Sequence, residues 1–333
     1  MADGTNLNVS GLGNLTAINI NNGGTITVQG GGSSTYDNSF IGASSRSGLT
    51  ITINSGGTLT SASGTTNTYH LNPGSLVLNG GTLAWGGTSS SSYGSWNLDQ
   101  NITVNDDSTI SAKFLILTKS GGTGINVSAG KTLTLSGTII SSTEAVNCNC
   151  DTNSLKINET SGFTGTVVLS GTNTYAGSTI IYAGTLVLAT NAPSNSAGAL
   201  GKATSAVLLG STSGSSNASL LTNGAYTVGR PITVQSGNSG TITIGGTGAF
   251  SSTFSGNIIL NKSATLTADA SGTATFQTGI ISGTGAMTKS GAGTVIFSAA
   301  NTYSGNTTVN AGVLSITSSG KIYSGLGNSG PII

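Results

Sequence analysis

The chain has 333 residues and a formal net charge of +1, because ten Lys and Arg nearly balance nine Asp and Glu. Charged residues make up only 6% of the sequence and form no basic stripe, so nucleic acid is not an expected partner. No apolar run approaches the roughly 18 residues of a transmembrane helix, so a membrane span is not expected either.

The apolar residues are regularly placed, which argues against disorder in a chain with so little charge. Leu, Ile and Val arrive in short alternating runs, as at 49–53, 76–78 and 132–135. A period of two is typical of β-strands, and no helical period of useful length is present. The inward residues of these runs should form the core. They are Ile51, Ile53, Leu76, Leu78, Leu133, Leu135, Leu186, Leu188, Leu314 and Ile316.

A short motif recurs along the chain, in which a turn with Asn and Gly precedes Thr and an apolar residue. Its copies lie at 21–26, 54–59, 79–83, 105–110, 128–133, 182–186, 262–266 and 310–314. From Thr25 to Val313 the motif averages about 26 residues per turn, which is within the range of solenoid repeats. One copy cannot bury its apolar face alone, so stacked coils about 4.8 Å apart are expected. The sequence therefore predicts an all-β chain, a single β-solenoid over 1–333 with about 13 coils and a length on the order of 60 Å.

A longer repeat lies in the second half of the chain. Residues 171–188 and 299–316 are nearly the same sequence. The stretch 281–314, which contains Met-Thr-Lys-Ser-Gly and Asn-Thr-Tyr-Ser-Gly, resembles the autotransporter-associated β-strand repeat, also called the passenger-associated transport repeat. Residues 167–188 resemble a second copy, and 117–124 resemble a third, partial copy.

The resemblance covers 115–320, whereas 1–114 would be more divergent coils of the same solenoid. Residues 142–155 and 191–202 break the rhythm and are expected to protrude as loops. The resemblance implies a right-handed parallel β-helix, export from the cell, and a passenger on the surface of a bacterium. The family shares no catalytic residues, so none is carried over to this chain.

Few residues could carry chemistry. Asp106 and Asp107 would point to opposite faces on a strand, so turn-forming carboxylates are favoured over calcium ligands or a catalytic pair. His70 is the sole histidine and no Gly-x-Ser-x-Gly elbow accompanies it, which favours a surface histidine over a catalytic one. Cys148 and Cys150 would lie in a loop as two thiols or a local disulfide, and no further metal ligands cluster near them. No metal and no cofactor are expected.

Aromatic residues offer one candidate binding site. Trp85, Tyr93 and Trp96 flank the loop 86–95 and could stack on sugars or on another protein, or could cover the core. Tyr175 and Tyr303 occupy equivalent positions in the two long repeats. This equivalence favours a structural stack of the two rings over a binding site.

The Thr-x-Thr pairs suggest one further binding surface. Threonine side chains aligned in rows on one face could fit the surface of an ice crystal. The pairs recur at gaps of 8 to 109 residues, which does not predict one aligned face, so ice binding is not favoured. The pairs lie at 25–27, 50–52, 58–60, 132–134, 241–243 and 265–267.

The leading functional hypothesis is a non-enzymatic extracellular structural protein, a rigid rod for surface display, adhesion or end-to-end assembly into fibres. Its partners would be copies of itself, surface glycans, or proteins of a host or neighbouring cell. Coil-forming sequence near both termini, at 7–20 and 313–333, motivates head-to-tail assembly, which Lys or Pro at Val9 or Ile316 should block. Two alternatives stay open: a β-helix enzyme acting on polysaccharide, and a passive stalk for a functional domain outside this sequence.

Overall fold

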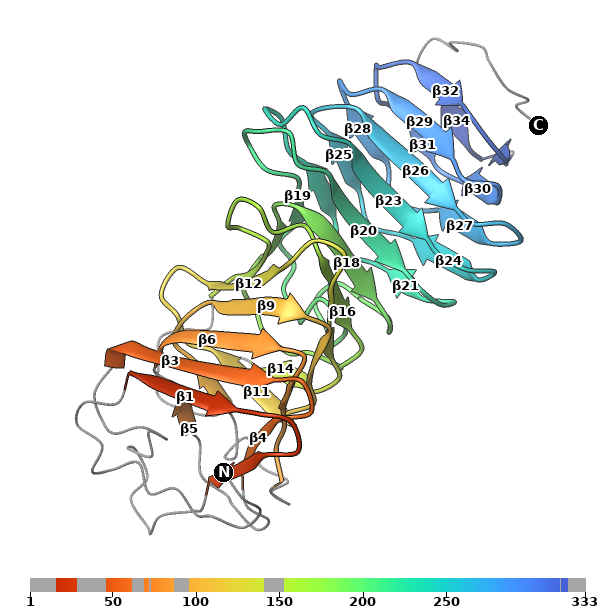
Figure 1. Ribbon diagram of the computed structural model, residues 1–333. Coiled ribbons are helices and arrows are strands. Elements are labelled where there is room, and N and C mark those ends of the chain that lie inside the picture. The colour runs from red at the N-terminus through yellow and green to blue at the C-terminus, as the bar shows by residue number, and fades with distance from the viewer. Residues whose placement is uncertain are drawn as a thin grey trace. The chain divides into compact units, whose positions relative to one another are not determined.

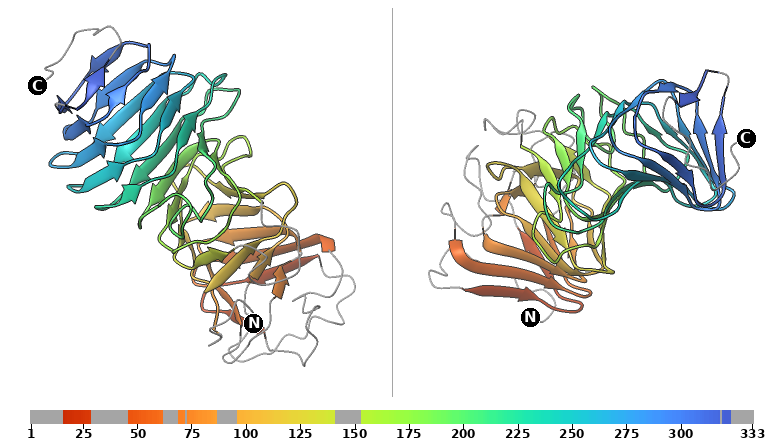
Figure 2. Two further views of the ribbon diagram at one scale, coloured as in Figure 1. Left: turned by 180° about the vertical axis from the view of Figure 1, so that it is seen from behind. Right: turned by 90° about the horizontal axis from the view of Figure 1, so that it is seen from above.

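The computed structural model describes residues 16–28, 46–61, 69–71, 73–86, 96–140, 153–317 and 319–322. Throughout these ranges the regular elements are β-strands, and the strands within each sheet pair in parallel. The expected all-β parallel β-helix is confirmed. The chain divides into two compact units, Met1–Gly177 and Ser178–Ile333, and Figures 1 and 2 show the stacked strands of each.

In the first unit, successive strands from β3 onward pass through three sheets in turn, so these coils have three faces. The first sheet is ordered β1 (Ala17–Ile20), β3 (Arg46–Asn54), β6 (Pro73–Asn79), β9 (Ile102–Asp106), β12 (Thr123–Val127) and β15 (Leu155–Ile157). The second is ordered β2 (Thr25–Val28), β4 (Thr58–Ser61), β7 (Thr82–Leu83), β10 (Ser108–Ile110), β13 (Thr132–Leu135) and β16 (Thr166–Leu169). The third contains β5 (Tyr69–Leu71), β8 (Trp96–Leu98), β11 (Phe114–Leu117) and β14 (Thr138–Ile140).

The corner between the first two sheets explains the recurring Asn and Gly of the short motif. Asn54 Nδ2 donates to Asn21 Oδ1 at 2.9 Å, and Asn79 Nδ2 donates to Asn54 Oδ1 at 3.0 Å. These bonds form an asparagine ladder with one rung per coil. Gly56 has a φ of +71°, a conformation that favours glycine, and a Cβ on Gly81 would lie 2.4 Å from the side chain of Ile53.

The second unit has the same construction. Its first sheet is ordered β17 (Thr179–Ile181), β19 (Val207–Leu209), β22 (Ile232–Val234), β25 (Ile258–Leu260) and β28 (Ile281–Gly283). Its second sheet is ordered β18 (Gly184–Leu188), β20 (Ala218–Thr222), β23 (Ile242–Gly246), β26 (Ala264–Ala268), β29 (Met287–Ser290) and β32 (Thr307–Val309). Its third is ordered β21 (Thr227–Val228), β24 (Ser251–Phe254), β27 (Thr273–Phe276), β30 (Thr294–Phe297) and β33 (Val313–Ile316), and β31 (Ala300–Asn301) pairs with β34 (Lys321–Ile322).

Inward side chains of equal register stack into columns along each unit. In the third sheet of the second unit, the Phe254 and Phe276 rings stack at 4.9 Å, and Phe297 meets Phe276 edge-on at 6.1 Å. Such pairs add to the free energy gained from burial of the rings. Nine of the ten expected core residues are buried. Ile316 is the exception, because β33 ends the order of its sheet and its side chain is half-buried.

Two irregular segments were expected to protrude. Residues 191–202 contain no strand, yet Ala192, Ala199 and Leu200 within them are fully buried, and Ala192 forms an isolated bridge with Val228. Of 142–155, residues up to 152 lie outside the described part of the chain. Within the described ranges, no helix has the length and apolarity needed to cross a membrane.

Candidate functional site

The aromatic candidates are divided between core and surface. Trp96 begins β8 and is fully buried, and its Nε1 donates to the carbonyl oxygen of Ala84 at 2.7 Å. Trp85 is half-buried and meets Trp96 edge-on, with ring centroids 5.6 Å apart. Trp96 therefore serves the core, and its indole has no surface on which a ligand could stack. Tyr93 lies outside the described residues, so Trp85 is the described residue of this site with exposed area.

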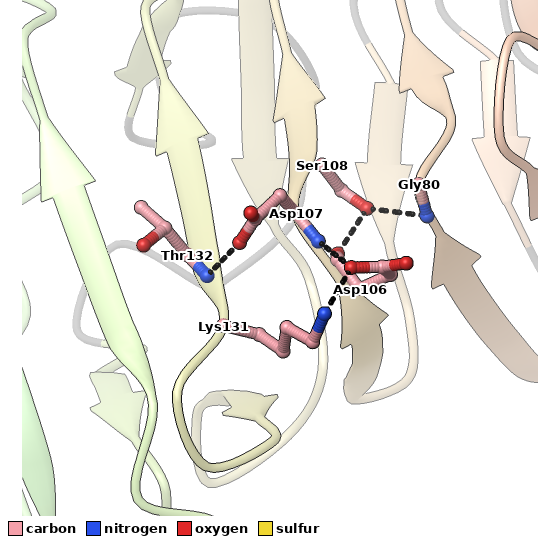
Figure 3. Close-up of polar contacts among 6 residues, drawn as sticks. All are labelled: Gly80, Asp106, Asp107, Ser108, Lys131 and Thr132. Atoms are coloured by element: carbon pink, nitrogen blue, oxygen red, sulfur yellow. Dashed lines mark hydrogen bonds and ion pairs between the residues drawn. The ribbon is translucent and has the colours of Figure 1, made fainter.

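The acidic pair lies at a corner of the first unit and acts on the neighbouring coils (Figure 3). Asp106 Oδ1 accepts hydrogen bonds from Lys131 Nζ at 2.6 Å and from the Asp107 amide at 2.9 Å. The bond from Lys131 holds the pKa of Asp106 below its usual value, and the same bond raises the pKa of Lys131. Asp107 Oδ1 instead accepts from the Thr132 amide at 2.7 Å, one coil further on. The two carboxylates therefore join coils, which fits the turn interpretation.

Other described carboxylates also hold the backbone or its neighbours. Glu159 accepts from Asn101 Nδ2 at 2.7 Å and forms an ion pair with Lys156 at 3.0 Å. Asp269 Oδ2 accepts from the amide of Gly248 at 2.8 Å. Among the described residues, no three His, Cys, Asp or Glu side chains are placed to share a metal ion.

The remaining sequence candidates are placed only in part. His70 lies in β5, in register with Asn97, and its side chain is outside the described set. Cys148 and Cys150 fall in the undescribed segment.

The two repeat copies use the same buried hydrogen bonds at different places in the coil. Asn173 Oδ1 accepts from the Ile139 amide at 2.8 Å, and Asn301 Oδ1 accepts from the Ile281 amide at 2.9 Å. Each asparagine side chain thus accepts a hydrogen bond from the backbone amide of a strand residue 20 to 34 positions earlier in the sequence. Both asparagines are almost completely buried.

Two residues after each asparagine lies a buried tyrosine. Tyr303 and Thr307 share a hydrogen bond between their hydroxyls at 2.6 Å, and Tyr175 is buried at the equivalent position of the other copy. Both tyrosines are therefore structural.

Three cationic side chains of the second unit donate hydrogen bonds to backbone carbonyl oxygens rather than to carboxylates. Lys289 is fully buried in β29, and its Nζ donates to the carbonyl oxygens of Ser290, Gly291 and Ala311 at 2.6–3.0 Å. Burial lowers the pKa of Lys289. Arg230 is fully buried and donates to the carbonyl oxygen of Leu200 at 2.6 Å. Sequence reasoning missed these sites, because the acceptors are turn carbonyls that only the fold brings together.

The third such cation lies at a groove. Lys262 Nζ donates to the carbonyl oxygen of Asn238 at 2.6 Å and also to that of Gly240. This lysine lines an open groove of about 420 Å³, together with Thr241, Thr265 and other small polar residues of the second sheet. The groove is polar, and the residues that line it include no acid and no aromatic side chain.

A column of threonines crosses the second sheet of the first unit. The parallel register aligns Thr25 with Thr58, Thr58 with Thr82, Thr82 with Thr109, and Thr109 with Thr134. All five side chains point outward, and each threonine is followed by a buried residue.

The Thr-x-Thr pairs themselves do not share one face. Only 25–27 and 58–60 lie in the same register on this sheet, because 132–134 contributes Thr134 alone to the column. The pair 50–52 is in β3 of the first sheet, and 241–243 and 265–267 are in the second unit, so these pairs form no single aligned face, as expected. The column is completed by Thr82 and Thr109, which belong to no such pair. The turns and loops absorb the differences in coil length, while the strands keep their register.

A second outward column runs beside the first. Thr27 aligns with Thr60, and backbone hydrogen bonds continue this register through Ala84 and Ser111 to Ser136. We call the two columns together the threonine face: Thr25, Thr58, Thr82, Thr109 and Thr134, with Thr27, Thr60, Ala84, Ser111 and Ser136. The face consists of small uncharged residues, and nine of its ten residues carry a hydroxyl.

The comparisons with known proteins bear on the repeats. Searches of curated proteins and of solved structures gave no significant match. A scan against family models matched the passenger-associated-transport-repeat at residues 164–188 and 287–316. These matches contain the buried Asn173–Tyr175 and Asn301–Tyr303 elements, and they agree with the resemblance seen in the sequence. The chain is thus a parallel β-helical protein that carries two segments of the passenger-associated-transport-repeat.

Proposed function

We propose that this chain is a non-enzymatic passenger protein, exported to the surface or surroundings of a bacterial cell and used there for display, adhesion or assembly. The observation that carries the proposal is the pair of passenger-associated-transport-repeat segments within a parallel β-helix. A solenoid built from such repeats presents long, regular faces, which suits a structural or adhesive role.

The placement of the described acids supports a structural role over hydrolysis of polysaccharide. Such hydrolysis uses a pair of carboxyl groups on opposite sides of one bond, about 5–9.5 Å apart. Here Asp106, Glu159 and Asp269 are each engaged with a lysine, an amide or the backbone of another coil. Incubation of the full chain with pectin, mannan and related polymers should release no reducing ends. Release that a single carboxylate substitution abolished would favour the enzyme alternative.

Export can be tested directly on the cells that make the protein. On intact cells the chain should be labelled by an antibody and digested by added protease, because a passenger faces the outside. Protection from both until the cells are lysed would contradict the proposal, whereas a cytoplasmic control protein should be protected in either case.

Display, adhesion and assembly differ in their partners. A filament seen in negative stain, with sedimentation that depends on concentration, would assign assembly. Ile316→Lys in β33 should weaken it, because β33 ends its sheet order and lies where a neighbouring strand could add. Retention on a glycan array would assign adhesion, and Trp85→Ala tests the aromatic site because Trp85 keeps exposed area. A strictly monomeric chain that binds no glycan favours the stalk.

A further inference from the structure

Asn101, Gly124 and Lys156 lie side by side across three neighbouring coils of the first sheet. Lys156 in β15 is in register with Gly124 in β12, and the register of β12 with β9 places Asn101 on the other side of Gly124. Each of the three precedes a buried isoleucine, so all three face outward. The backbones of Asn101 and Lys156 are thus about 10 Å apart, two strand spacings. Gly124 between them has no side chain, so the side chains on either side can meet above β12.

The carboxylate of Glu159 joins the other two side chains. Its Oε1 accepts a hydrogen bond from Asn101 Nδ2 at 2.7 Å, and its Oε2 lies 3.0 Å from Lys156 Nζ. The carbonyl oxygen of Asn101, Oδ1, accepts from the amide of Gly124 at 2.8 Å. A Cβ on Gly124 would lie 2.4 Å from Glu159 Oε1 and 2.9 Å from Asn101 Cγ. The carboxylate and the side-chain amide therefore meet directly above the glycine.

This cluster differs from the ion pair of Lys131 with Asp106 in the same unit. In that pair the side chains are 39% and 47% exposed, and the carboxylate also accepts from the backbone amide of Asp107. The side chains of Lys156 and Glu159 are each only 19% exposed, and their carboxylate holds a side-chain amide instead. An amine, a proton acceptor and a carbonyl that receives a backbone N–H are the groups that acyl transfer to an amine requires.

We propose that Lys156 and Asn101 condense into an intramolecular amide bond, with Glu159 as the group that transfers the protons. Both reacting side chains contact the same carboxylate, so the fold holds them close together before any bond forms. Such proximity replaces an encounter in solution, which makes an otherwise very slow reaction of an amide with an amine accessible. The reaction occurs once in each chain, so it is a maturation step and does not depend on the proposed display or adhesion.

The condensation balances without any further reactant. Glu159 takes a proton from the Lys156 ammonium, and the lone pair of the resulting amine attacks Asn101 Cγ. As the Nζ–Cγ bond forms, negative charge develops on Oδ1, where the Gly124 amide stabilises it. Glu159 then gives its proton to Nδ2 and takes one from Nζ. The Cγ–Nδ2 bond breaks, the carbonyl forms again, and the departing ammonia takes the last proton from Glu159 and leaves as ammonium.

The product would join coils that are not direct neighbours. Coils of a solenoid contact only the coils next to them, whereas a bond from Asn101 to Lys156 passes over β12 and links the coils on both sides of it. The bond also closes residues 102–155 into a loop, which lowers the conformational entropy of the unfolded chain as a disulfide does. The first unit would then resist unfolding at this place more than non-covalent contacts allow.

The test measures the mass of the full chain and of its tryptic peptides. Condensation removes one ammonia from the intact mass. Trypsin cleaves after a lysine only while its amine is free, so the digest should contain 47–113 joined to 132–202. Lys156→Arg keeps a cation beside Glu159 but removes the amine, and Glu159→Gln keeps the size of the side chain but removes the proton acceptor. Lys131→Arg is the matched control in the other ion pair. Circular dichroism checks that each variant is folded.

We expect the wild type and Lys131→Arg to lose one ammonia and give the joined peptides, and Lys156→Arg and Glu159→Gln to keep their full mass. The proposal is overturned if the wild type keeps its full mass after prolonged incubation, or if folded Lys156→Arg or Glu159→Gln still forms the link. Loss of ammonia with the two peptides still separate would indicate an asparagine that cyclised onto its own backbone, and would also overturn it. Should Glu159→Gln fail to fold, Lys156→Arg decides, because arginine can keep the ion pair.

Discussion

Leu220 and Leu221 are adjacent in β20 and provide the sharpest test of the β-helical core. Leu220 is fully buried and points inward, in register with Leu186 on one side and Ile244 on the other. Leu221 points outward and is half-buried, between Val187 and Gly245. Because strand side chains alternate between faces, two identical substitutions one residue apart probe opposite environments.

The size of the effect follows from burial. Truncation of leucine to alanine removes three carbon atoms, worth roughly 2–2.5 kcal/mol in transfer free energy when the side chain is fully buried. The cavity left in a column of fixed strands cannot close fully, which brings the expected cost of Leu220→Ala to about 3–5 kcal/mol. Leu221→Ala leaves no enclosed cavity, and its cost should stay below about 1.5 kcal/mol. The first value is a large share of the roughly 5–15 kcal/mol that stabilises a folded domain.

Urea unfolding followed by circular dichroism measures both variants against the wild type. The midpoint for Leu220→Ala should fall far more than that for Leu221→Ala, with the slope of free energy against urea unchanged in both. Equal losses, or a larger loss for Leu221→Ala, would refute the inward assignment of β20 and with it the register of the second sheet. A changed slope would show that the substitution alters the surface exposed on unfolding or breaks two-state behaviour.

Three further predictions concern turns and buried polar groups. Gly81→Ala should destabilise the chain, because its Cβ would meet the preceding coil at 2.4 Å, whereas Gly48→Ala meets nothing within 4 Å and should cost little in thermal unfolding. Asn301→Ala should cost about 1–3 kcal/mol in urea unfolding, because the buried Ile281 amide loses its acceptor. Burial lowers the pKa of Lys289 from 10.5, so the unfolded chain binds more protons between the folded-state pKa and 10.5. Stability should therefore rise with pH across that window, and Lys289→Met should lack this rise; equal slopes in the two proteins would contradict it.

The strand core could be predicted from the sequence because its period is simple. Inward residues such as Ile53 and Leu133 alternate with polar ones, and any register error of two residues keeps them inward. Thr132 illustrates the point. The short motif equates it with Thr109, but Thr109 aligns with Thr134. Leu133 remains buried under either alignment, so the core prediction was right although the register was not.

The buried polar groups could not be predicted, because their positions follow no simple period along the sequence. Lys289 interrupts an apolar column between Leu266 and Val309, and nothing in its sequence neighbourhood marks it as buried. Its acceptors are carbonyl oxygens, which every residue possesses, so their position depends on the turn alone. Trp96 likewise lies beside a polar loop in the sequence, although its indole is in the core. The threonine face depends on register between coils of unequal length, which periodicity along the chain does not reveal.

The two repeat copies show what the repeated sequence encodes. In the second unit, the first copy places Thr179–Ile181 in the first sheet and Gly184–Leu188 in the second. The equivalent strands of the other copy, Thr307–Val309 and Val313–Ile316, belong to the second and third sheets. The same sequence thus forms a strand, a corner and a strand on different pairs of faces, so the 128 residues between Asn173 and Asn301 are not a whole number of coils.

The motif therefore forms the corner between the first and second sheets in one copy and the corner between the second and third sheets in the other. Each copy also carries its own buried asparagine, whose side chain accepts a hydrogen bond from a backbone amide of an earlier strand. Because the same motif serves at different corners, its copies are irregularly spaced along the sequence although the strands that they form stay in register with their neighbours. The second sheet of each unit keeps one outward column of hydroxyl residues in register, from Thr25 to Thr134 in the first unit and from Thr185 to Thr308 in the second, because the stacked strands set the register whatever the length of chain between them.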